Sequence, residues 1–107
     1  MGDPDYYDAQ IAGWWLWGID VQLEYVAELP KAVGEYDYGS QTVRLCEGQP
    51  AVFEADTVLH ELLHAIDDAM QLGMSERQVH CTATGIVALF RDNPDLLDYV
   101  YGALRTR

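Results

Sequence analysis

The spacing of the apolar residues changes about halfway along this 107-residue chain, and that change limits the fold more than any other feature. Residues 14–25 are rich in aromatic and β-branched residues. Within them the apolar residues Trp17, Ile19, Val21 and Leu23 alternate with Gly18, Asp20 and Gln22, and this period of two predicts a strand with one buried face. Residues 32–37 and 42–45 predict two shorter strands, separated by a Gly39-Ser40 turn. The N-terminal half is therefore expected to form a small antiparallel β-meander of about three strands.

The second half has the spacing of helices. From about residue 55 to residue 72, apolar residues recur three or four positions apart, and Gly73 follows as a stop. Ser75 and Gln78 make the pattern of a capping box at the start of a second helix, and Asn93-Pro94 starts a third. The residues expected to face the core from the last two helices are Val79, Ala83, Ile86, Phe90, Leu96, Leu97, Val100 and Leu104.

These elements predict an α+β fold in which the meander packs on three helices. The length predicts a single domain over residues 1–107, and hydrophobic residues at 50% can fill one core. Residues 1–10 are expected to be a flexible tail.

The segment from His60 through Glu61 to His64 lies inside the first predicted helix. Residues four apart are just over one turn apart, so both imidazoles project from one face, as two zinc ligands require. Glu61 stands beside them, where its carboxylate can hold a metal-bound water. The His-Glu-x-x-His pattern predicts one zinc ion per chain, with Glu61 as the catalytic residue.

A catalytic zinc site usually has three protein ligands. The second predicted helix offers Glu76 in its first turn and His80 one turn later, on the same face. Glu76 is favoured as the third ligand because it lies closest to the Gly73 corner, and His80 remains the alternative ligand or a neighbour of the site.

The segment His60–Asp68 resembles the metal-binding helix of the gluzincins, the thermolysin-like zinc peptidases whose third ligand is a glutamate on a following helix. Residues 34–38 and 42–45, ahead of the metal helix, are similar to the strand pair of the ImmA/IrrE-type family and related minimal gluzincins of phages, prophages and mobile elements. The likeness covers residues 32–90. It departs from the gluzincin pattern at His80, where a short polar residue is typical.

The resemblance implies a metallopeptidase that cleaves a peptide bond with a zinc-bound water, Glu61 passing the water's proton to the leaving amine. It also implies an oxyanion-stabilising Tyr or His, for which Tyr36, Tyr38 and His80 are the candidates. Asp68 lies four residues after His64, within reach of the second ring nitrogen of that histidine, and is expected to accept a hydrogen bond from it.

The composition of the chain limits the kinds of partner and the cellular location that are expected. The net charge of -12 repels phosphate backbones, so a protein or peptide substrate is expected rather than nucleic acid. The apolar stretch at residues 11–19 is too short to span a bilayer, so neither a membrane segment nor a signal peptide is expected. Cys46 and Cys81 are expected to be reduced thiols in a cytoplasmic protein.

Trp14, Trp15 and Trp17 form an aromatic cluster that is expected to belong to the core or to contact a partner chain or a second copy.

The sequence leaves two functions other than a peptidase open. One is a zinc-containing regulatory or binding module with weak or no catalysis, which the short chain favours. The other is an acidic decoy for a DNA-binding protein, which only the charge suggests.

Overall fold

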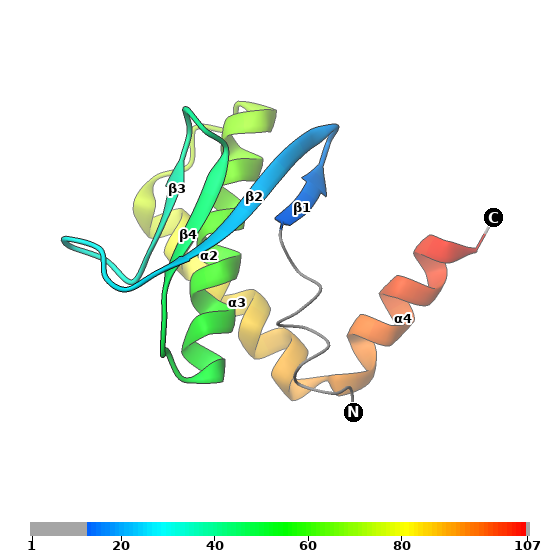
Figure 1. Ribbon diagram of the computed structural model, residues 1–107. Helices are drawn as coiled ribbons and strands as arrows, with labels where there is room; N and C mark the ends of the chain where they lie inside the picture. The colour runs from blue at the N-terminus through cyan, green and yellow to red at the C-terminus, as the bar shows by residue number, and fades with distance from the viewer. Residues whose placement is uncertain (1–12, 107) are drawn as a thin grey trace.

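The computed structural model describes residues 13–106, which form a four-stranded sheet followed by three helices (Figure 1). The strands are β1 (Gly13–Leu16), β2 (Ile19–Val26), β3 (Gly34–Asp37) and β4 (Thr42–Cys46). The helices are α2 (Ala51–Met70), α3 (Glu76–Asp92) and α4 (Pro94–Arg105). The predicted α+β class is confirmed. The tail predicted at residues 1–10 lies outside the described residues.

The stretch predicted as one strand over residues 14–25 is a hairpin. Its turn residues Trp17 and Gly18 have φ angles of 56° and 83°, between the paired residues Leu16 and Ile19. Positive φ at both positions of a two-residue turn matches the twist of the flanking strands. Gly18 occupies a polar position of the alternation, so the period of two continues through the turn and conceals it.

The prediction of a purely antiparallel meander is wrong for one strand pair. The sheet order is β1-β2-β4-β3, and β2 and β4 are parallel neighbours. After β2 the chain passes to the far edge of the sheet, and β3 returns to β4 as an antiparallel hairpin. Burial accounts for this order, because Val43 and Leu45 make β4 the more apolar strand and both are fully buried between two neighbouring strands.

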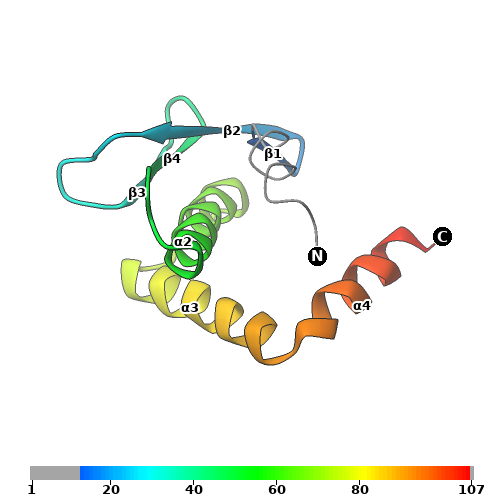
Figure 2. The same ribbon diagram turned by 60° about the horizontal axis from the view of Figure 1, so that its bottom comes forward.

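One face of the sheet is covered by α2, and α3 lies beyond α2 (Figure 2). The core between sheet and helix consists of Val21, Tyr36, Val43, Leu45 and Ala65. The opposite face of the sheet carries the polar residues of the strands, where Arg44 forms ion pairs with Glu24, Glu35 and Asp37.

The corner between α2 and α3 follows the prediction closely. The capping box is confirmed, with the Gln78 amide donating to Ser75 Oγ at 3.1 Å and the Ser75 amide donating to Gln78 Oε1 at 2.8 Å. Thr84 contacts Asp56, whereas Glu76 contacts His60 one turn further along α2. The two helices therefore run antiparallel, which brings the start of α3 to the middle of α2.

The prediction that the apolar residues of the last helix face the core is wrong. Val79 and Ala83 of α3 are fully buried, but α4 has no buried residue. Both views show α4 leading away from the sheet and α2 (Figures 1 and 2). Within residues 13–106, Leu97, Val100 and Leu104 therefore stay exposed.

The tryptophans divide between core and surface. Trp14 packs against the core cluster, whereas Trp15 and Trp17 are each 78% exposed.

Both cysteines are free thiols. None of the helices in residues 13–106 is long and apolar enough to cross a membrane.

Candidate metal centre

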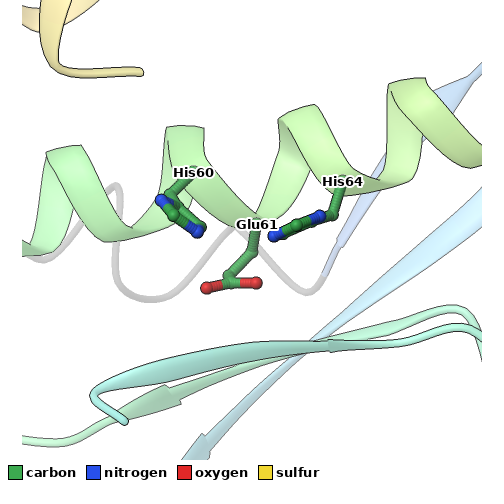
Figure 3. A group of neighbouring side chains, drawn as sticks. All are labelled: His60, Glu61 and His64. Atoms are coloured by element: carbon green, nitrogen blue, oxygen red, sulfur yellow. The ribbon is translucent and has the colours of Figure 1, made fainter. Parts of the chain in front are cut away.

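The centre of α2 brings together the three residues of the His-Glu-x-x-His pattern (Figure 3). His60, Glu61 and His64 each offer a ligand atom, and these atoms all lie within 4.8 Å of one another. The centroids of the two imidazole rings are 5.1 Å apart. A tetrahedral ion with zinc–nitrogen bonds of about 2 Å holds two imidazole centroids about 5 Å apart. The spacing fits two imidazoles on one metal ion.

The first turn of α3 completes this arrangement with Glu76. Its Oε1 lies 2.5 Å from Nε2 of His60, and its Oε2 lies 3.1 Å from Nε2 of His64. The Nε2 atoms of both imidazole rings therefore point at the carboxylate of Glu76. Two ligand atoms on a tetrahedral zinc ion are about 3.4 Å apart, so Glu76 would have to retreat by less than about 1 Å to admit an ion. Its side chain is 69% exposed and is free to do so.

The remaining nitrogen of His64 is hydrogen-bonded by Tyr38. The Tyr38 hydroxyl lies 3.2 Å from Nδ1, on the side of the ring away from Glu76. A bond there fixes the tautomer and orientation of a metal-binding imidazole. This is the role predicted for Asp68, for which the described residues show no such bond.

Neither Tyr36 nor Tyr38 is among the residues that line the cavity over the imidazoles. Tyr38 bonds the remote nitrogen of His64, and Tyr36 is a core residue that packs edge-to-face on Tyr38 with ring centroids 4.9 Å apart. Burial is the largest cause that raises the pKa of Tyr36, with the charge of Asp68 next. The predicted candidate that lines the cavity is His80, whose ring centroid lies 6.1 Å from that of His60.

Glu61 is buried beneath β3, with 6% of its surface exposed. Burial raises its pKa to about 7, and the nearby charges of Glu76 and Glu35 add to the effect. An ordinary carboxyl is fully ionised at neutral pH, so this shift brings Glu61 into the range in which a general base accepts and releases protons.

The close approach of β3 to Glu61 depends on Gly34. A Cβ atom at this position would lie 2.4 Å from Cγ2 of Thr57 and 3.3 Å from Oε2 of Glu61. Thr57 is held in place by hydrogen bonds to Gln49 Oε1 at 3.0 Å and to the Phe53 carbonyl at 2.8 Å. Neither Gly34 nor Thr57 was predicted as a site residue, although Thr57 stands four residues before Glu61 and so shares its helix face.

An open cavity of about 450 Å³ lies over these residues. Residues 32–34 at the start of β3 form one wall, α2 forms the floor, and Glu76 and His80 of α3 form the other wall. The cavity therefore runs from the edge strand of the sheet across both imidazoles.

Comparisons with protein-family models, with curated protein sequences and with solved structures found no match for this chain. The resemblance to the ImmA/IrrE-type gluzincins stays a prediction, and the chemistry of the site is argued from its own geometry.

Proposed function

We propose that this chain is a zinc-dependent peptidase that hydrolyses a peptide bond with a water activated by Glu61. The observation that carries the proposal is a convergence: the Nε2 atoms of His60 and His64 point at the Glu76 carboxylate, and a second, buried carboxylate lies beside them. Burying an acid costs free energy. A structural metal site has no use for an acid that is not a ligand, whereas hydrolysis needs one.

His60, His64 and Glu76 would hold the ion. Two imidazole nitrogens and a carboxylate oxygen form a ligand set that zinc accepts, and three protein ligands leave a fourth position open. Bound there, zinc would lower the pKa of a water and polarise the scissile carbonyl. Tyr38 would keep the His64 ring oriented toward the ion through its bond to Nδ1.

Glu61 would act as the general base. Its ionised carboxylate would accept a proton from the attacking water and then deliver that proton to the nitrogen of the departing amine. The Gly34–Thr57 contact supports the position of this carboxylate between α2 and β3.

The substrate class follows from the cavity wall. In the described sheet, β3 is an edge strand that pairs only with β4. Its first residue, Gly34, lines the cavity together with Ala32 and Val33, which precede the strand. An extended peptide can pair with such an edge and thereby present its backbone to the metal. A protein or peptide substrate, and not a nucleic acid, remains the expectation for a chain of net charge -12.

The test combines metal content with a matched pair of substitutions. Purified protein should hold one zinc per chain, lose it to EDTA and cleave at least one member of a broad peptide library. Glu61→Gln should keep the zinc and remove cleavage, because an amide cannot accept the proton. Glu54→Gln makes the same chemical change on the same helix outside the cavity and should leave cleavage unchanged. Zinc-free protein that takes up no added zinc would overturn the proposal, as would equal cleavage by all three proteins.

A zinc-containing regulatory module is the second candidate, and the position of His80 favours it. His80 lines the same cavity as the three proposed ligands and its ring lies near that of His60. A shift of this side chain onto the metal would give four protein ligands, which is the closed coordination of structural zinc sites. Cobalt-substituted protein distinguishes the two: a closed site has no exchangeable water, and His80→Ala would then create one.

A further inference from the structure

Four apolar side chains form a largely exposed stripe along α4, with the Arg105 guanidinium 5.3 Å from the centre of the Tyr101 ring. Leu97, Val100, Tyr101 and Leu104 are 56%, 40%, 59% and 78% exposed. Their spacing of three, one and three residues places them on one side of the helix. Tyr99, on the opposite side, is 75% exposed.

This exposure is costly for a helix of 12 residues. Isolated helices of that length are marginal in water, and most helices in proteins are stabilised by burying an apolar face. α4 packs on α3 near their shared corner and then leads away from the domain (Figure 2). Residues 13–106 therefore leave the stripe largely exposed.

We propose that α4 is a self-association surface, on which two copies of this chain pair their α4 helices antiparallel about a two-fold axis. The stripe is symmetric about its centre between Val100 and Tyr101. In an antiparallel pair, Leu97 of each copy packs on Leu104 of the other, so the same surface serves both partners.

The charges on α4 select the antiparallel direction. Asp98 in its N-terminal half and Arg105 at its C-terminal end flank the stripe on the same side, whereas Asp95 lies four residues before Tyr99, on the opposite side of the helix. Antiparallel pairing brings Asp98 of each helix toward Arg105 of its partner and opposes the two helix dipoles. Parallel pairing would put like charges and like dipole ends together.

The pairing is expected to be weak. The stripe exposes roughly 400 Å² on each copy, so a symmetric pair would bury about 800 Å², below the usual size of a stable interface. The net charge of -12 on each copy opposes association. Because salt screens that repulsion, added salt should strengthen the dimer. A basic partner held by charge would show the reverse dependence.

The first test measures association by sedimentation velocity from about 1 μM to 1 mM at low and high salt. The chain should shift from monomer toward dimer with concentration, and further at high salt. Leu104→Glu should weaken the dimer at least about tenfold, whereas Tyr99→Glu adds the same charge off the stripe and should leave it unchanged. A monomer under all conditions, or equal effects of the two substitutions, would refute the proposal.

The second test fixes the direction by disulfide trapping in a Cys46→Ser, Cys81→Ser background. Val100→Cys should link to itself, because residue 100 lies beside the two-fold axis. Leu104→Cys should not, since the two copies of residue 104 would be about 10 Å apart along the axis. A mixture of Leu97→Cys and Leu104→Cys chains should link. Rapid self-linking of Leu104→Cys would exclude the antiparallel pair. Neither test depends on zinc or on hydrolysis, so its failure would leave the proposed function standing.

Discussion

Substituting Gly34 by Ala tests how closely the edge strand must approach the metal helix. The new Cβ would lie 2.4 Å from Cγ2 of Thr57, 3.3 Å from Oε2 of Glu61 and 3.4 Å from the Arg44 carbonyl oxygen. The contact with Thr57 must open by about 1 Å to reach ordinary van der Waals distance. Thr57 cannot turn aside without losing its two hydrogen bonds, so β3 and α2 have to separate.

The expected loss of stability is modest but measurable. Overpacking of this kind costs about 1–3 kcal/mol. Gly34 is not among the glycines with positive φ, so alanine is tolerated by the backbone, and reduced freedom of the unfolded chain returns about 0.4–1 kcal/mol. Gly34→Ala should therefore lower the free energy of unfolding by about 1–2 kcal/mol. Because the new Cβ would press on the Glu61 carboxylate and neither imidazole is among the atoms nearest to it, cleavage should fall more than zinc affinity.

A second substitution separates this clash from a general loss of packing. Thr57→Ser removes the Cγ2 methyl and keeps the hydroxyl with its two hydrogen bonds. In the double variant the tightest remaining contact is the 3.3 Å one with Glu61, which needs a shift of only a few tenths of an ångström. The two substitutions should therefore compensate each other by about 1–2 kcal/mol in urea unfolding of the EDTA-treated protein. Additive effects would refute the reasoning, because they would show that Thr57 does not limit the approach of β3.

Three further outcomes follow from the site. Tyr38→Phe should weaken zinc binding about 10-fold to 100-fold in a chelator competition, because the His64 ring loses the bond to its Nδ1; unchanged affinity would contradict the orienting role. Glu76→Ala should weaken zinc binding far more than His80→Ala, and the reverse order would exchange their roles. The third outcome concerns pH: the raised pKa of Glu61 means that the folded, metal-free protein holds a proton which the unfolded chain releases near pH 4.5. Stability should therefore fall as pH rises from about 4.5 to about 7, by at most about 3 kcal/mol, and Glu61→Gln should remove that component from urea midpoints measured across the range.

The grouping of the candidate metal ligands on α2 could be predicted because their arrangement is local. His60, Glu61 and His64 lie within just over one helical turn, so a helix of any tertiary context places them together. Glu76 needed one further fact, the short corner that makes α3 antiparallel to α2. Tyr38 was predicted as an oxyanion stabiliser, but its hydroxyl lies against Nδ1 of His64. The sequence could not show this contact, because it depends on how the β3–β4 hairpin packs on α2.

The errors in the fold arose where local patterns leave several pairings equally good. Alternation predicts a strand but not its neighbours, and it could not show that β4 would pair with β2. The same limit applies to α4, whose amphipathic stripe predicts that something covers Leu97 and Leu104 but not which molecule does so.

The sheet order has a consequence for the site that the meander would not have had. Because β4 lies between β2 and β3, β3 becomes the edge strand, and its first residue, Gly34, lines the cavity beside the imidazoles. In a simple meander the second strand would be enclosed between two neighbours, with no free edge to offer a peptide. Gly34 then lets this edge lie directly against Glu61, so the same strand that is open to a peptide on one side buries the proposed base on the other. The order of the strands therefore brings the proposed peptide-binding edge, the proposed general base and the proposed metal ligands into one cavity.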